Sequence, residues 1–163
     1  MLHVFWFALA ILAGCIAYQD FKDRLISLWL IVSFCLINTT QYLMVFSLKE
    51  LLNNSLFCII YFLFLYGALH VYYFLKTKKI QTIIDEKIGW ADILLVFIIG
   101  ACIDSVLVVV FFTVSFLMAL LLHLFILRSS RPIPFAAVLV INYLLYLVVY
   151  GAAIKSSWQV FEF

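Results

Sequence analysis

The segment Gly89-Trp90-Ala91-Asp92-Ile93-Leu94-Leu95 places an acidic side chain at the start of a long apolar run. An ionisable residue within a membrane helix is energetically costly, so it marks a candidate functional site. Asp92 has a candidate partner in Asp20, which ends the first apolar stretch of the chain. Two carboxylates facing each other inside a membrane protein indicate acid–base chemistry carried by helices.

The composition predicts an all-α, polytopic membrane protein. Hydrophobic residues make up 69% of the 163 residues and charged residues 11%, against roughly 45–50% and about 25% in soluble domains. We expect residues 1–163 to form a single membrane domain in the lipid bilayer, with no room for a second, water-soluble domain. The net charge of +2 is too small to indicate a nucleic-acid partner, and the basic residues lie in loops.

Six apolar stretches are interpreted as transmembrane helices, since a helix needs about 20 apolar residues to cross the hydrocarbon core. Within the second, the polar patch Asn38-Thr39-Thr40-Gln41 is expected to face other helices, because lipid offers no hydrogen-bond partners. The six stretches run from about Val4 to Tyr18, Leu25 to Phe46, Leu51 to Leu75, Asp92 to Cys102, Val106 to Leu127 and Pro134 to Ile154.

The basic residues orient these six stretches. The loops after the first, third and fifth stretches hold eight Lys and Arg residues, whereas the opposite side holds only Lys49 and Lys155. Because positively charged loops remain in the cytosol, both termini are expected to face away from it. Asp20 and Asp92 are then both expected at the cytosolic face.

Two carboxylates at one site can divide the work of acid and base. Like charges held close together cannot both ionise easily, so one group keeps a proton. The ionised group can take a proton from water while the protonated group polarises a peptide carbonyl, as in aspartic proteases. The simpler interpretation is that both are interfacial residues at helix ends, which suits Asp92 at a helix start better than Asp20 at a helix end.

The remaining candidate residues point to no cofactor. Asp104 lies roughly 18 Å deeper than Asp92 along the helix, so it is expected to be a turn or cap residue. His70 and His123 are expected to form interhelical hydrogen bonds. No histidine has a His or Cys ligand three or four residues away, so no metal site is expected. The four cysteines, Cys15, Cys35, Cys58 and Cys102, are expected to be buried small hydrophobic residues.

Three segments occur in an order and spacing that match a known family. In the first, Asp20 is followed after five residues by Ile26 and Ser27, with basic residues between them. The second is the stretch from Gly89 to Asp92, followed by Gly100. The third is Ile133-Pro134-Phe135 at the start of the last apolar stretch. Together they resemble the type IV prepilin leader peptidases, which belong to the membrane aspartic proteases with a Gly-x-Gly-Asp (GxGD) motif. The chain departs from that pattern at four positions, where Ser27 replaces a Pro, Leu28 a polar residue, Ala91 a Gly and Leu94 a Lys.

The resemblance implies a hydrolase of the aspartic-type endopeptidase class in the inner (plasma) membrane. It implies that Asp20 and Asp92 are catalytic and that the site is lined by Gly89, Ala91, Ile26, Pro134 and Phe135. The implied substrate is a prepilin-like protein with a short basic leader and an apolar helix, cleaved at the cytosolic face. The chain is most similar to the short family members, which lack the N-methyltransferase and zinc segment.

The sequence is also compatible with two other interpretations. The chain is alternatively a catalytically silent membrane subunit of a pilus or secretion assembly, in which both aspartates can be replaced by Asn without loss of function. A small transporter with Asp92 as its proton-carrying residue is the third interpretation, and it predicts proton-coupled flux that disappears when Asp92 alone is changed.

Overall fold

The computed structural model describes residues 2–23, 25–78, 89–122, 124 and 134–158, and these residues form six helices with no strand among them. The predicted all-α class is therefore confirmed for the described part of the chain. In sequence order the helices are α1 Leu2–Asp23, α2 Leu28–Leu43, α3 Leu48–Thr77, α4 Trp90–Ala101, α5 Ser105–Leu122 and α6 Phe135–Trp158.

The six helices differ in their capacity to cross a membrane. Three segments, in α1, α3 and α5, are long and apolar enough to do so: Val4–Asp23, Leu48–Tyr72 and Ser105–Leu122. By contrast α4 has 12 residues and is about 18 Å long, well short of the ~30 Å hydrocarbon core of a typical bilayer. The structure therefore supports a membrane protein with three evident spans, alternating along the chain with shorter apolar helices.

The ends of α1 and α3 differ from the sequence-based expectation. The polar segment after Tyr18 does not interrupt α1, because Asp20 to Asp23 form its last turn. At the start of α3, Ser47 and Glu50 form a reciprocal capping box in which each side chain bonds the other's backbone N–H, which satisfies two otherwise unpaired donors. Lys78, in the left-handed conformation at φ 53°, ends α3 beyond the predicted boundary.

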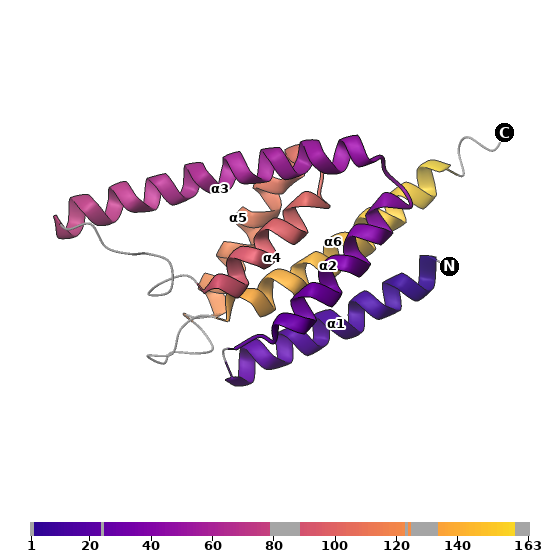
Figure 1. Ribbon diagram of the computed structural model, residues 1–163, viewed down its shortest axis with the longest axis horizontal. Helices are drawn as coiled ribbons and strands as arrows, with labels where there is room; N and C mark the ends of the chain where they lie inside the picture. Colours follow the sequence, from indigo (N-terminus) through magenta and orange to yellow (C-terminus); the bar gives the residue numbers. More distant parts are fainter. Residues whose placement is uncertain (1, 24, 79–88, 123, 125–133, 159–163) are drawn as a thin grey trace.

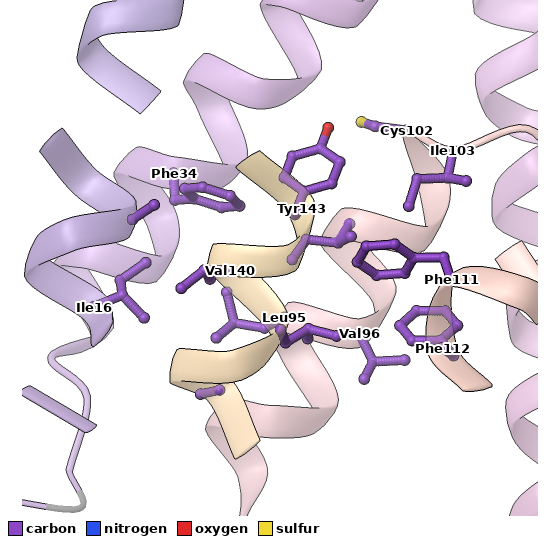
Figure 2. Close-up of a cluster of buried hydrophobic side chains, with 14 of the residues drawn as sticks. Ile16, Phe34, Leu95, Val96, Cys102, Ile103, Phe111, Phe112, Val140 and Tyr143 are labelled. Carbon is purple, nitrogen blue, oxygen red and sulfur yellow. The ribbon is translucent and has the colours of Figure 1, made fainter. Parts of the chain in front are cut away.

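Helix α6 lies at the centre of the packing and contacts α1, α4 and α5. Helix α4 packs in turn against α2 and α3, and α1 packs along α2. Figure 2 shows side chains from α2, α4, α5 and α6 meeting around Tyr143, with Phe34 on one side and Phe111 on the other. Both of these phenylalanine rings approach the Tyr143 ring edge-on, an arrangement that aromatic pairs favour.

A close contact holds α3 against α4. The Cys58 thiol on α3 points at the Val96 carbonyl on α4, with 3.7 Å between Sγ and O. Gly100 lies beside Cys58 without room for a Cβ atom, so the two backbones approach closely there. One turn further along α3, the rings of Phe62 and Phe97 lie 5.0 Å apart. These contacts set the position of α3 along α4.

Helix α3 extends well past the start of α4, as Figure 1 shows. Asp92 precedes Phe97 by five residues, whereas α3 continues for fifteen residues beyond Phe62. The apolar part of α3 reaches Tyr72, ten residues beyond Phe62.

The predicted polar patch of α2 faces other helices in part. Asn38 is buried, accepts a hydrogen bond from the Tyr143 hydroxyl at 2.7 Å and donates to the Ile98 carbonyl at 3.4 Å. Gln41 is also buried, and its Oε1 has no hydrogen-bond partner within the described residues. Thr40 is exposed and bonds the Leu36 carbonyl of its own helix at 2.7 Å, which satisfies its hydroxyl without a neighbouring helix.

Asp104 is confirmed as a cap, because its Oδ1 accepts the Val106 N–H at 2.9 Å at the start of α5. At His70, Nδ1 is buried without a hydrogen-bond partner in the described part of the chain, and the ring lies against Tyr66 of the same helix, so this nitrogen does not form the expected interhelical bond. His123 lies outside the described residues.

The four cysteines differ in their burial. Cys58 and Cys102 are buried as expected and Cys35 is half-buried, whereas Cys15 is exposed.

Candidate functional site

The Asp20 carboxylate is buried and lies against the start of α6. Its side chain belongs to the last turn of α1 and is only 8% exposed. The Oδ2 atom accepts a hydrogen bond of 2.9 Å from the backbone N–H of Ala137. Because a buried carboxylate is costly unless it is hydrogen-bonded, this contact helps to explain how α1 tolerates an acid at this depth.

The Asp92 carboxylate reaches the same turn of α6 from the other side. It lies in the first turn of α4 and accepts backbone hydrogen bonds from Gly89 and from Ala136. The bond to Gly89 is one half of a capping box, in which an acid at the third helical position binds the N–H of the cap residue. The bond to Ala136 links α4 to α6.

The two predicted site aspartates are thus brought together. They bond the N–H groups of two consecutive residues, Ala136 and Ala137, and they are close enough to repel each other electrostatically. They come from helices separated by more than sixty residues of sequence, so only the tertiary packing of α1 and α4 on α6 creates the pair. The arrangement suits groups that share a proton, because like charges at short range disfavour double ionisation.

The start of α6 explains why it accepts these two side chains. Pro134 occupies the cap position, where its carbonyl accepts the Val138 N–H at 3.3 Å. A proline side chain has no hydrogen-bond acceptor, so it cannot bind the free N–H groups of the first turn as a Ser or Asp would. The two carboxylates supply that function from other helices. The positive end of the α6 dipole also favours negative charge at this point.

Gly89 leaves room for the Asp92 side chain to fold back. A Cβ atom on Gly89 would lie 3.3 Å from Asp92 Oδ2, which is closer than such contacts normally are. The backbone of Gly89 is ordinary, at φ −72° and ψ 145°, so space rather than conformational freedom accounts for the glycine. The structure thus gives a physical reason for the first Gly of the motif.

The other predicted site residues lie at different places around the two carboxylates. Ala91 is half-buried in the first turn of α4, and Ile26 is half-buried against the hydrophobic core. Pro134 is buried, and the Phe135 ring stacks on Phe116 of α5 at 4.7 Å. Pro134 and Phe135 therefore adjoin the carboxylate pair through the backbone of α6, whereas Ile26 has a packing role.

Two departures from the family pattern have simple consequences in the structure. Leu94 is exposed and lies two residues after Asp92; positions two apart on a helix point to nearly opposite sides. The missing lysine would therefore not face the carboxylate pair. Ser27, where the family has a proline without an N–H, donates its N–H to the Gln19 side chain at 3.0 Å and so ties the start of α2 to α1.

Sequence reasoning missed the amides of Ala136 and Ala137. The available signal was an absence: the segment Arg131-Pro132-Ile133-Pro134 offers no Ser, Thr, Asp or Asn before an apolar helix, so the free amides need partners elsewhere. Arg131 and Ile133 themselves lie outside the described residues. Among those that are described, no group of His, Cys, Asp and Glu is arranged to hold a metal ion.

The chain was compared with protein-family models, with curated proteins and with solved structures, and none of them matched.

Proposed function

We propose that this chain is a membrane-embedded aspartic endopeptidase that removes the basic leader from prepilin-like precursors at the cytosolic face of the plasma membrane. The observation that carries the proposal is the convergence of Asp20 and Asp92 on consecutive amides of α6. The resemblance of the three sequence motifs supplies the reaction class and the substrate class.

The pair has the chemistry that peptide hydrolysis needs. One carboxylate, ionised, takes a proton from the attacking water, while the other, protonated, donates a hydrogen bond to the scissile carbonyl. The two groups titrate as a unit, so neither role is assigned to one residue. Low-dielectric helix walls around the pair strengthen both interactions relative to water.

The place of the pair at helix ends fits a substrate that is itself a membrane helix. Asp92 lies in the first turn of α4, which is too short to cross a bilayer alone, and the apolar part of the neighbouring α3 continues to Tyr72. A peptide bond at the cytosolic end of an apolar substrate helix would meet the pair at these helix ends. The predicted orientation, with six crossings and both termini outside the cytosol, puts the pair on the side where a basic leader is retained.

The test is cleavage of a candidate prepilin-like protein by the purified chain in liposomes. Asp20→Asn and Asp92→Asn are each expected to abolish cleavage, because the amide side chain cannot exchange the proton. Asp104→Asn is the matched control: Asp104 caps α5 away from the pair, and Asn retains the cap, so cleavage should continue at the wild-type rate. Full activity in either of the first two variants would exclude that residue from catalysis.

The capping geometry also favours a second candidate, a catalytically silent subunit of a pilus or secretion assembly. Both aspartates bind free amides of α6, and this structural role alone would explain their positions. Asn retains one side-chain oxygen that can accept a bond from these amides. If the chain is a silent subunit, the pilus or secretion assembly should still form in both Asn variants. If it is a protease, assembly should stop and the uncleaved precursor should accumulate.

A further inference from the structure

The first turn of α6 is anchored tightly beside the carboxylate pair. Ala136 and Ala137 are fully buried, and the ring of the preceding residue, Phe135, stacks on Phe116 of α5. Helices α1 and α4 both pack on α6. The two N–H groups are therefore fixed in space relative to the helices that carry Asp20 and Asp92.

Two consecutive amides can control the separation of two carboxylates. The Ala137 N–H holds Asp20 and the Ala136 N–H holds Asp92, although electrostatic repulsion alone would drive the side chains apart. The bond to the ionised carboxylate is charge-assisted, which makes it stronger than a bond between neutral groups. Neighbouring amides of one rigid turn thus offset the repulsion and keep both carboxylates within reach of one substrate group.

We propose that the backbone amides of Ala136 and Ala137 are positioning groups of the catalytic pair, so that the first turn of α6 sets the geometry in which the two carboxylates act. This inference rests on the proposed function for its kinetic consequence, but its structural part stands separately. Loss of one N–H releases one carboxylate, and cleavage slows although the substrate binds as before.

The direct experiment replaces one amide by an ester, through incorporation of the α-hydroxy analogue of alanine. This change removes the N–H at residue 136 or 137 and leaves the side chain intact. We expect kcat for the prepilin-like substrate to fall about 10- to 100-fold, the range for a lost hydrogen bond to a charged group, with KM unchanged. The matched control is an ester at Val138, whose N–H bonds the Pro134 carbonyl within α6, and here kcat should change less than threefold.

Equal losses of kcat at residues 136, 137 and 138 would mean that any damage to the first turn of α6 lowers activity, and would overturn the proposal. A rise in KM with unchanged kcat would also overturn it, because the amides would then serve substrate binding.

Amide hydrogen exchange tests the geometry without any substrate. Asp20→Ala should accelerate exchange at Ala137 by tenfold or more and leave Ala136 nearly unchanged, and Asp92→Ala should do the reverse. Asp20→Asn should retain protection at Ala137, because its oxygen still accepts the bond. Unchanged exchange in both alanine variants would overturn the positioning role. Selective exchange in a chain that cleaves no prepilin-like substrate would retain the structural part and reject the proposed protease.

Discussion

At the scale of single residues, Asp92 combines two roles that are usually separate. Its carboxylate caps its own helix through Gly89 and a second helix through Ala136, while lying near a like charge at Asp20. Capping stabilises the fold and repulsion opposes it. Substitutions of Asp92 that keep a hydrogen-bond acceptor but remove the negative charge therefore separate the effect of capping from the effect of repulsion.

Asp92→Asn and Asp92→Ala should therefore differ in stability. Asn keeps one acceptor oxygen and removes the repulsion, so we expect the variant to unfold close to the wild-type temperature. Ala removes the acceptor and should cost about 1–2 kcal/mol, the range for a lost helix cap. Thermal unfolding in detergent measures both. If the two variants unfold at the same temperature, the bonds to Gly89 and Ala136 contribute nothing to stability.

Gly89→Ala is expected to lower cleavage without unfolding the protein. The new Cβ would lie 3.3 Å from Asp92 Oδ2, so the carboxylate must shift by a few tenths of an ångström. Small misplacements of catalytic groups are costly, and we expect a severalfold lower kcat, with an unfolding temperature close to that of the wild type. Wild-type kcat in this variant would show that the pair tolerates the crowding.

At the scale of helices, Gly100 controls the approach of α3 to α4. A methyl group at this position has no space beside the Cys58 thiol, so Gly100→Ala should destabilise the protein by about 1–3 kcal/mol, as overpacking does. Cys58→Ala removes the sulfur and should recover part of that loss in the double variant. A double-mutant cycle on unfolding free energies measures the coupling, and strictly additive effects would contradict the contact.

Tyr143→Phe tests the polar link between α6 and α2. The variant leaves the buried Asn38 oxygen without the 2.7 Å bond from the tyrosine hydroxyl. We expect a loss of about 1 kcal/mol, within the range measured for interhelical hydrogen bonds in membranes. Phe111→Leu, which alters an apolar neighbour of the same ring, is the control for general core damage. No change in the unfolding temperature of Tyr143→Phe would indicate that water replaces the hydroxyl.

The helices themselves were largely predictable from sequence, because apolar composition and helix length are local properties. All six predicted stretches contain a helix, although α1 and α3 run further than their apolar residues. Those extensions depend on local hydrogen bonds that hydropathy does not register, such as the capping box at Ser47. The Thr40 hydroxyl bonds its own helix, and His70 Nδ1 is buried without a hydrogen-bond partner among the described residues. Both outcomes likewise depend on which side of the helix a neighbouring helix covers, which the local sequence does not specify.

The candidate site was predictable in its residues but not in its construction. Ionisable groups at the ends of apolar stretches identify Asp20 and Asp92, because such groups are rare at membrane depth. Their partners are backbone amides, which carry no residue-specific signal. That α6 holds the pair depends on the packing of α1 and α4 against it, which no spacing within one segment encodes.

At the scale of the whole molecule, the distribution of basic residues predicts which ends of the helices face the cytosol. Leu25, between α1 and α2, and Val45, between α2 and α3, are exposed on opposite ends of α2. In intact cells, a membrane-impermeant thiol reagent should label Val45→Cys and not Leu25→Cys, and the wild-type chain controls for the native thiols. The reverse pattern would place the aspartate pair outside the cytosol and contradict the proposed substrate orientation.

The central claim is that Asp20 and Asp92 act as one catalytic unit, and a kinetic double-mutant cycle tests it most directly. Cleavage of a prepilin-like substrate in liposomes would be measured for the wild type, Asp20→Asn, Asp92→Asn and the double variant. We expect each single change to reduce kcat at least a thousandfold and the double change to cost no more than either, as for residues that work together. Wild-type cleavage in either single variant, or losses that multiply in the double variant, would contradict the account.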